Sequence, residues 1–324
     1  MKTASNITIL TPTYDDWESV FVLLNNLDGV LSNDGLNANI VVVDDGSPDF
    51  VDTQEFLSLS FKAIQKVEVI TLTRNIGNQR AQATGIAYIA ENLECDILVV
   101  MDSDLEDQPK YVPKLIAEAQ KTNREIVFAE RTRRSEGSAF KIFYKLYKYL
   151  YKALTGLPIS IGNFSAIPGR LVKRVANTAE IWSHFPAGIM RAKIPFRTIP
   201  ATRGQRLYGE SKMNLVSLVV HGLNGIAVHA DTVGARVVLA IFGFGGVVSI
   251  GLIITIAKRY FVDFFVVGWT SIVVIILGIA IIQAFMAAIF MAFVIVSSRN
   301  QQVVIPAIDY KKYILENKRI YPAT

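Results

Sequence analysis

The sequence has only one cysteine, Cys95, and only three histidines among its 324 residues. A single cysteine excludes an intrachain disulfide and agrees with a protein of a reducing cytosol. His184, His221 and His229 show no metal-ligand spacing with acids or with the cysteine, and no His-Glu-x-x-His pattern occurs. We therefore interpret the three histidines as structural or interfacial residues.

The motifs of several other protein classes are also missing. The sequence contains no Walker phosphate-binding loop, no Ser-His-Asp pattern and no Gly-x-Gly-x-x-Gly turn. No nucleic-acid-binding motif appears, so nucleic acid is not expected as a partner. The formal net charge of +5 therefore indicates contact with anionic lipid headgroups or with a phosphorylated substrate.

Charged residues are absent from two long stretches near the C-terminus, residues 237–257 and 264–298. Hydrophobic residues make up 51% of the chain and the mean hydropathy is +0.35, which is too apolar for an ordinary soluble enzyme. A helix of about 20 apolar residues crosses the hydrocarbon core of a bilayer. We predict two transmembrane helices, at about 234–257 and 271–296. The alternative, a pair of buried helices in a soluble enzyme, is disfavoured because the two runs are neighbours.

The distribution of basic residues predicts the orientation of these helices. The link between them holds Lys258, Arg259 and Asp263. More basic residues lie outside the pair: Arg236, Arg299, Lys311, Lys312, Lys318 and Arg319. The positive-inside rule therefore places both termini in the cytoplasm. Residues 1–6 are polar and the apolar run 7–10 is too short for a signal peptide, so we expect a multi-pass protein of the cell (inner) membrane with a cytoplasmic N-terminal domain.

The first 130 residues alternate short apolar runs with helical patterns. Strands are predicted at 7–14, 38–47, 67–75 and 96–104, and helices at 17–31 and 79–92. Apolar strands separated by helices predict an α/β domain with a mainly parallel sheet, whose ligands bind beyond the carboxyl ends of the strands. Polar residues stand at each of those ends: Tyr14-Asp15-Asp16, Asp44-Asp45, Arg74-Asn75, and Asp102 with Asp104. We expect them to form one site.

The segment "VVMDSDLEDQP" places four acids within six positions after the fourth strand: Asp102, Asp104, Glu106 and Asp107. Carboxylates so close together repel one another, and a shared hard cation relieves that repulsion. Mg²⁺ and Mn²⁺ prefer such oxygen ligands and complete their shell with water and substrate phosphates. The pattern therefore indicates a cation that neutralises a diphosphate. Surface acids in a turn are the alternative, and the apolar strand in front of them disfavours it.

Two segments have the pattern of helices at a membrane surface. In residues 138–154, the lysines 141, 145, 148 and 152 share one helical face and aromatic or aliphatic residues fill the other. A globular helix with a solvated lysine stripe is the alternative. Residues 213–231 form a second candidate, a juxtamembrane amphipathic helix. Interfacial helices of this kind are compatible with self-association into a homo-oligomer.

Taken in order, "TPTYDD", "VVVDDGS", "RNIG", "MDSDLEDQP" and "RLYGESKMNL" resemble the motifs of glycosyltransferase family 2, which has the GT-A fold. With two C-terminal spans, the chain is most similar to the polyprenyl-phosphate glycosyltransferases, the relatives of dolichol-phosphate mannose synthase. The resemblance implies a cytosolic GT-A (Rossmann-like) domain at 1–212, a juxtamembrane helix at 213–231, a two-helix transmembrane hairpin at 232–298 and a cytosolic C-terminal tail at 299–324.

The resemblance also implies roles for individual residues. Asp102 and Asp104 match the metal motif, and Glu106 stands where relatives often have a glutamine that joins the metal. Asp44 would read the base and Asp45 would support its loop. The remaining nucleotide-binding and substrate-binding positions are Pro12, Tyr14, Asp16, Arg74, Gly77, Ser103, Arg131, Arg206, Ser211 and Lys212. Arg206 and Lys212 would supply charge-assisted bonds to the diphosphate, although anchoring to lipid headgroups is the alternative for both.

One position departs from the family pattern. Many relatives have an aspartate, a candidate base, where "SIGNFSAIPGR" has Asn163. An amide is a poor proton acceptor, so a hydroxyl acceptor would need a base from elsewhere. A phosphate monoester, with a second pKa of about 6, is already largely dianionic at neutral pH and needs no such base. Asn163 therefore favours a lipid phosphate as nucleophile, with Arg133, Arg134, Lys141 and Lys145 as groups that attract it.

These inferences predict a hexosyltransferase of cell-envelope glycan biosynthesis. It would transfer a sugar with inversion from a UDP- or GDP-sugar to a polyprenyl phosphate, using Mg²⁺ or Mn²⁺, at the cytoplasmic membrane face. Asp102, Asp104, Asn163, Arg206 and Lys212 would be its catalytic residues. Two alternatives stay open: a glycosyltransferase with a hydroxyl acceptor, such as a glycolipid or polysaccharide, and a non-catalytic membrane component that binds a nucleotide sugar.

Overall fold

The computed structural model describes residues 6–48, 60–131, 138–158, 161–204, 206, 215–261, 268–299 and 303–322. Its strands are β1 (Ile7–Thr13), β2 (Ala38–Asp44), β3 (Ile64–Leu72), β4 (Ile97–Val100), β5 (Ile126–Arg131), β6 (Ile161–Pro168), β7 (Phe196–Ala201) and β8 (Ile314–Tyr321). Its longer helices are α1 (Trp17–Asn33), α3 (Asn78–Asn92), α4 (Val112–Thr122), α5 (Ser138–Thr155), α8 (Leu215–Ala227), α9 (Ala230–Phe261) and α10 (Trp269–Arg299). The shorter ones are η1 (Pro109–Tyr111), α6 (Gly169–Ala176), η2 (Ala179–Trp182), α7 (Phe185–Arg191), α11 (Pro306–Asp309) and η3 (Tyr310–Lys312).

The strands form one sheet in the order β7-β5-β6-β4-β1-β2-β3-β8. The central strands β4, β1, β2 and β3 pair in parallel, and β5 pairs in parallel with β7. β6 and β8 pair antiparallel with their neighbours. The predicted α/β class with a mainly parallel sheet is confirmed.

Both faces of this sheet are buried, which explains why its central strands are apolar without alternation. In β2, Ile40 and Val42 belong to the core that includes α1 and α4. The intervening Val41 and Val43 belong to the core that includes α3 and α6. Side chains point alternately to the two faces of a strand, so an unbroken run of valines fills both cores.

Two local features fix the helices that flank the central strands. Asp28 in α1 accepts the backbone N–H groups of Lys62, Ala63 and Ile64 at 2.7–3.0 Å, so α1 holds the start of β3. Gly85 lets α3 lie close to β1, because a Cβ there would be 2.4 Å from the Leu10 side chain. This close approach brings the first turn of α3 to the carboxyl edge of the sheet.

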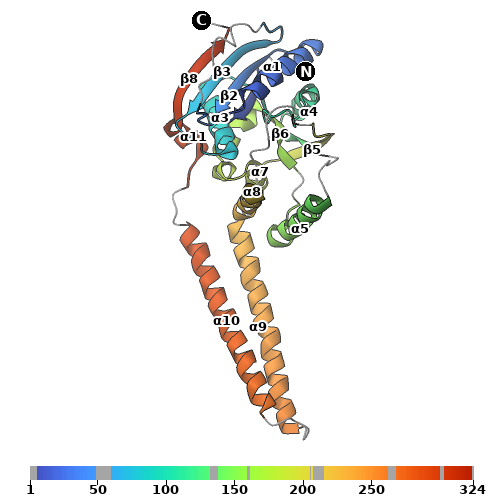
Figure 1. Cartoon of the computed structure of the whole chain (residues 1–324), viewed down its shortest axis with the longest axis vertical. Coiled ribbons are helices and arrows are strands. Elements are labelled where there is room, and N and C mark those ends of the chain that lie inside the picture. Colours follow the sequence, from blue (N-terminus) through green and yellow to red (C-terminus); the bar gives the residue numbers. More distant parts are fainter. Residues whose placement is uncertain are drawn as a thin grey trace. The chain divides into compact units, whose positions relative to one another are not determined.

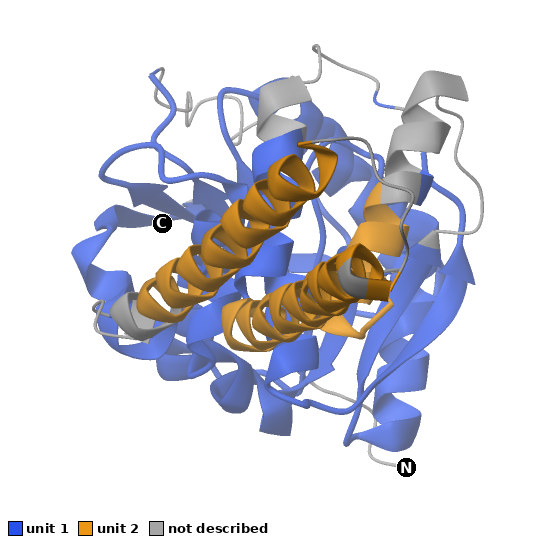
Figure 2. Ribbon diagram, turned by 90° about the horizontal axis from the view of Figure 1, so that it is seen from below, with its two compact units in different colours: residues 1–146, 159–228, 303–324 blue, residues 147–158, 229–302 orange. Residues whose placement is uncertain are grey.

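The chain divides into two compact units, drawn in different colours in Figure 2. Unit 1 comprises residues 1–146, 159–228 and 303–324, and unit 2 comprises residues 147–158 and 229–302. In unit 2, α9 and α10 lie side by side (Figure 1) and cover the two predicted spans. Their membrane-length segments, Ala230–Arg259 and Trp269–Val294, have mean hydropathies of 2.6 and 2.9. Little of either is buried, as expected for helices with lipid around them.

The residues after the hairpin belong to the sheet of unit 1. We expected a cytosolic tail at 299–324, and within it β8 pairs antiparallel with the edge strand β3. Tyr321 packs edge-on against Phe61 with ring centroids 4.9 Å apart, and its hydroxyl accepts the N–H of Phe61. Both ends of the hairpin are therefore joined to the same folded unit.

The end of α5 and the start of α9 form the rest of unit 2. Arg236 donates to the carbonyl oxygen of Ala153 at 2.9 Å, which satisfies one of the last carbonyls of α5. Tyr151 is fully buried, with its ring edge-on to His229. Lys148 and Lys152 are exposed, and so are Tyr149 and Leu150. An exposed surface that mixes lysines with apolar side chains is typical of a helix at a membrane interface.

Candidate active site

The four acids after β4 have different partners. Asp107 is buried and its carboxylate accepts the backbone N–H of Asp102 at 3.1 Å, so it shapes the loop itself. Asp102 accepts a bond from the side-chain amide of Asn78 at 3.2 Å. The loop also contains Leu105 at a φ of +66°, a conformation that costs energy for a branched residue. The chain thus accepts strain to place Asp102 and Asp104 at the end of β4.

Asp104 carries the clearest electrostatic signal in this loop. Burial, followed by the charges of Asp102 and Glu106, raises the pKa of Asp104 to about 6. Arg206 opposes this effect: its guanidinium lies 3.8 Å from Asp104 and 2.5 Å from Asp16. A half-buried carboxylate with more negative than positive neighbours is a group that a bound cation would stabilise.

Glu106 does not join Asp102 and Asp104 in a three-acid cluster. Its carboxylate accepts a bond from Nε of Arg203 at 2.7 Å. Gly204 donates its N–H to the Glu106 carbonyl at 2.8 Å, and Gln108 donates to the carbonyl of Thr202 at 2.8 Å. Among the described residues, no group of three or more histidine, cysteine or acidic side chains is arranged to hold a metal. The assignment of Glu106 to the metal stays a prediction; its observed contacts fasten the loop that carries Arg206.

The ends of β2 and β3 are tied together by a second pair of acids. Asp45 accepts the N–H groups of Ile76 and Gly77, both at 2.8 Å, while burial raises its pKa to about 6. Asp44 accepts the N–H and the hydroxyl of Ser47, and burial raises its pKa too. Gly46 has a φ of +71°, and a Cβ there would be 2.6 Å from the backbone of Arg74. Only glycine allows these two loops to approach so closely.

The end of β1 supplies the residues of the first predicted motif. Pro12 is a buried residue of the strand, in register with Val43, and Tyr14 is exposed beyond it. Asp15 donates its backbone N–H to Ser47 at 2.8 Å, so this loop is joined to the one after β2. Asp16 precedes α1 and holds Arg206. The structure thus brings the ends of β1, β2, β3 and β4 to one edge of the sheet.

The first turn of α3 connects these acids to Asn163. Local sequence patterns did not predict this connection. Gln79 donates to the side-chain oxygen of Asn163 at 3.2 Å and accepts the N–H of Phe185 at 2.7 Å. Its neighbour Asn78 holds Asp102. The visible signal was the segment "RNIGNQ", in which two amide residues follow Gly77 at the start of the predicted helix.

Two histidines lie next to this bridge. His184 precedes α7 and its Nδ1 accepts the N–H of Ala187 at 3.2 Å. The ring of His221, from α8, lies 4.6 Å from the ring of His184 between centroids, with 33° between their planes. Burial lowers the pKa of His221, and the charge of Asp102 acts in the opposite direction. Helix α8 therefore delivers a side chain toward the acid-lined edge, where sequence spacing gave no signal.

For the remaining predicted residues the structure gives only a position or an exposure, or does not describe them. Arg74 is exposed, and Ser103 is buried in the loop after β4. Arg131 ends β5, and its side chain lies outside the described part of the chain, as does that of Lys141. Ser211, Lys212, Arg133 and Arg134 also lie outside the described residues. Their assigned roles remain predictions.

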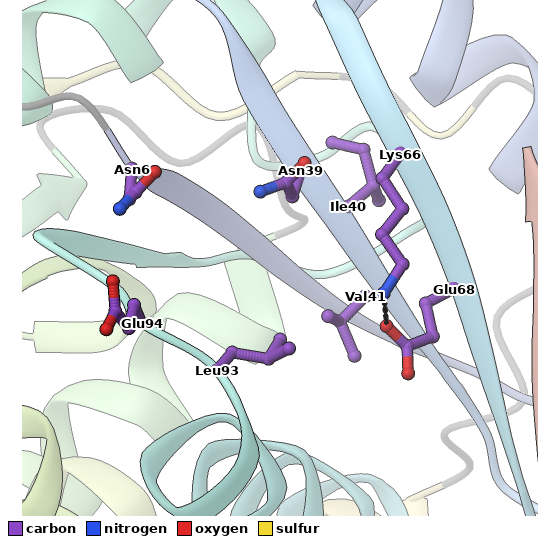
Figure 3. A pocket seen from close by; sticks show the side chains of 8 residues that line it. All are labelled: Asn6, Asn39, Ile40, Val41, Lys66, Glu68, Leu93 and Glu94. Atoms are coloured by element: carbon purple, nitrogen blue, oxygen red, sulfur yellow. Dashed lines mark hydrogen bonds and ion pairs between the residues drawn. The ribbon is translucent and has the colours of Figure 1, made fainter. Parts of the chain in front are cut away.

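A hollow of about 290 Å³ lies elsewhere, at the amino ends of the strands. Figure 3 shows its lining, in which Lys66 contacts Glu68 at 2.5 Å. Glu68 also accepts a bond from the hydroxyl of Tyr88, to which Asn317 of β8 donates in turn. Both carboxylate oxygens of Glu68 accept a hydrogen bond here, and Asn317 joins β8 to the same network. We interpret this hollow as part of the structural framework.

In a parallel-sheet domain, ligands bind beyond the carboxyl ends of the strands, which is where these acids and Arg206 lie. Residues 8–177, just over half of the chain, match the family model "Glycosyl transferase family 2". The chain belongs to this family and is a glycosyltransferase.

Three relatives indicate how far the similarity extends. An uncharacterized glycosyltransferase, YkcC, of Bacillus subtilis (strain 168) is 26% identical and covers 97% of this chain and 96% of its own. The undecaprenyl-phosphate 4-deoxy-4-formamido-L-arabinose transferase of Erwinia tasmaniensis is 24% identical over 67% of this chain and 66% of its own. The dolichol-phosphate mannosyltransferase of Pyrococcus furiosus is 37% identical, but over 39% of this chain and 33% of its own.

A solved structure supports the fold. Glucosyl-3-phosphoglycerate synthase from Mycobacterium tuberculosis, crystallised with Mn²⁺, uridine diphosphate and phosphoglyceric acid, aligns with a TM-score of 0.50 at 16% identity. The alignment covers 71% of this chain and 78% of that one. The expected GT-A fold is confirmed.

Proposed function

We propose that the protein transfers a sugar, with inversion, from a nucleotide-diphosphate sugar to a polyprenyl phosphate at the cytoplasmic face of a membrane. The observation that carries the proposal is the guanidinium of Arg206 between Asp16 and Asp104. Carboxylates that could bind a cation and an arginine that could bind a diphosphate lie together there, at the carboxyl edge of the sheet. This arrangement suits a nucleotide-sugar donor, because the negative charge of the donor is on its diphosphate.

The oxygens of Asp102 and Asp104 fit a hard divalent cation, Mg²⁺ or Mn²⁺, because two carboxylates leave room for water and diphosphate ligands. When bound, the cation would neutralise charge on the departing diphosphate. Arg206 would contribute a second positive charge to the same phosphates. Asp44 and Asp45 would shape the pocket for the base, which is that of a UDP- or GDP-sugar.

Asn163 favours a phosphate acceptor. Its side-chain oxygen accepts a bond from Gln79, and an amide removes no proton. A phosphate dianion needs no base, since its oxygen attacks C1 while the bond from C1 to the diphosphate oxygen breaks. A sugar phosphodiester and a nucleoside diphosphate are the products. An acceptor hydroxyl would have to lose its proton to another group.

Three observations support a lipid as the carrier of this phosphate. The hairpin of α9 and α10 is long and apolar enough to cross a membrane. Relatives with sequence similarity over two thirds of the chain are named for undecaprenyl phosphate. The pairing of β8 with β3 supports a hairpin whose two ends lie on the same side of the bilayer, which we propose is the cytoplasmic side.

The test is a transfer assay with purified protein, undecaprenyl phosphate, Mn²⁺ and a panel of radiolabelled UDP- and GDP-sugars. We expect one donor to yield a labelled lipid that mild acid hydrolyses, because sugar phosphodiesters are labile under conditions that leave most glycosides intact. Mass spectrometry of the product identifies the sugar and the linkage. An acid-stable product would instead identify a hydroxyl acceptor, and absence of transfer from every donor would contradict the proposal.

A further inference from the structure

Four uncharged side chains beside Asp102 have no part in binding the donor as described above. They are Gln79, Asn163, His184 and His221, and we call them the acceptor-side cluster. Gln79 joins two of its neighbours, since it bonds the side chain of Asn163 and the backbone of Phe185, the residue after His184. His184 stacks against His221. The cluster is thus one connected set supplied by α3, β6, the residue before α7, and α8.

Two contacts place this cluster next to the predicted cation ligands. Asn78, the residue before Gln79, donates to Asp102 at 3.2 Å. Gln79 itself bonds Asn163 and the N–H of Phe185, the residue next to the stacked His184. The cluster therefore borders the acid pair on the side formed by α3 and α8, whereas Arg206 approaches from the side of Asp16.

We propose that the acceptor-side cluster binds the phosphate of the acceptor lipid and that His221 donates a hydrogen bond to it. This inference rests on the proposed function and names the residues that would recognise its second substrate. It differs from the sequence-based interpretation of His184 and His221 as structural or interfacial residues.

The chemistry of the cluster suits a phosphate beside a cation site. A neutral imidazole has one ring N–H to donate. A lysine or arginine at this place would pair with Asp102 and compete with the cation. A neutral imidazole can bind a phosphate oxygen without that competition. Asn163 is likewise uncharged: Gln79 engages its oxygen, and its NH₂ group can donate to a ligand.

Helix α8 also exposes apolar side chains. Val219, Val220 and Leu223 are 38%, 49% and 57% exposed. They lie only one or two residues from the half-buried His221, so they point to a different side of the helix. The helix ends at Ala227, and the membrane-length helix α9 begins at Ala230. One helix therefore offers an imidazole for a phosphate and a separate apolar side for the hydrocarbon chain of a lipid.

The test compares His221→Phe, His221→Gln and the wild type in the same transfer assay. Phenylalanine keeps a ring to stack on His184 but has no donor, whereas glutamine keeps an N–H. A hydrogen bond to a charged group contributes about 1.5–3 kcal/mol, so we expect His221→Phe to raise the KM for polyprenyl phosphate about 10- to 100-fold. His221→Gln should recover most of that loss, and titration with UDP and Mn²⁺ should give the same affinity in all three proteins.

The control is Asn224→Ala, which removes an exposed polar side chain one turn further along α8. Its acceptor KM should equal that of the wild type. An unchanged acceptor KM in His221→Phe, an equal loss of UDP affinity, or no recovery in His221→Gln would each overturn the role of His221. If the wild type itself transfers no sugar to polyprenyl phosphate, the proposed function falls as well, and that result is seen before any variant is made.

Discussion

The two ends of the same sheet hold buried acids in opposite electrostatic states. At the carboxyl end, Asp104 and Asp45 have pKa values raised to about 6, mainly by burial. At the amino end, burial also raises the pKa of Glu68, but hydrogen bonds from Lys66, Tyr88 and Asn317 outweigh it and the net shift is downward. Among the described residues, Glu68 therefore has donors that favour its charged form, whereas for Asp104 and Asp45 burial outweighs the groups that favour theirs.

This difference separates a structural acid from a functional one. Glu68 stabilises the fold because its charge is matched within the chain, and its partner Asn317 belongs to the strand added after the hairpin. Asp104 is matched in part by Arg206, and its neighbours Asp102 and Glu106 oppose its ionisation. We propose that a ligand supplies the positive charge that would balance Asp104.

The largest effect expected from this comparison is on turnover in Asp104→Asn. The variant loses a predicted cation ligand, so transfer should fall by at least about a hundredfold. The folded protein should be no less stable than the wild type without metal, because a mutually repelling charge has been removed. Turnover in the transfer assay and thermal unfolding measure the two quantities. Wild-type turnover would exclude Asp104 as a cation ligand.

The next effect concerns Arg206→Ala, which removes the guanidinium shared by Asp16 and Asp104. Charge-assisted bonds to a diphosphate contribute about 1.5–3 kcal/mol, so the affinity for UDP should fall about 10- to 100-fold. Calorimetric titration with UDP and Mn²⁺ measures it. Arg191→Ala is a matched control, because this arginine also pairs with an acid, Glu180, at 3.1 Å. An equal loss in both variants would contradict a specific role for Arg206.

At the other end of the sheet, Glu68→Gln should affect stability and leave turnover intact. The amide cannot accept bonds from Lys66, Tyr88 and Asn317 as the carboxylate does, and a broken buried network costs about 1–3 kcal/mol. Denaturant unfolding monitors the free energy, and the transfer assay monitors function. A variant that loses turnover while keeping its stability would show that this end of the sheet also has a catalytic role.

The sequence predicted the central sheet well because its signals are local. Runs such as residues 40–43 are apolar on both faces, and that pattern has few interpretations besides a buried parallel strand. The polar residues at the strand ends then meet by geometry alone, which is why Asp16, Asp44, Asp45, Asp102 and Asp104 could be grouped in advance. Both long apolar helices were equally evident from composition.

Contacts between distant segments could not be predicted in this way. Strand β8 has a mixed polar sequence, and only its partner β3 explains why it is extended. Gln79 reaches Asn163 and Phe185 across 84 and 106 residues, respectively. The pairing of Arg203 with Glu106 and the stacking of His184 on His221 likewise depend on tertiary structure. No periodicity encodes such contacts, and these residues form much of the site beyond the acids.

The smallest effect expected is a difference in how stability depends on pH. A carboxyl with a raised pKa, such as Asp104, holds its proton in the folded state up to about pH 6, whereas the unfolded chain releases it near 3.8. Its contribution to stability is therefore present at low pH and is lost as the pH rises through 6. The lowered pKa of Glu68 has the opposite consequence, since its contribution is present above about 4.5 and is lost on acidification below that.

Thermal unfolding of metal-free Asp104→Asn, Glu68→Gln and the wild type between pH 3.5 and 8 tests this contrast. Relative to the wild type, Asp104→Asn should gain stability between about pH 4 and 7, by on the order of 1 kcal/mol. The deficit of Glu68→Gln should stay constant above about pH 5 and shrink only in more acidic buffer. If the stabilities of the two variants relative to the wild type changed with pH in the same way, the pKa values of both acids would be shifted in the same direction. The distinction between a matched acid and one that awaits a cation would then have to be abandoned.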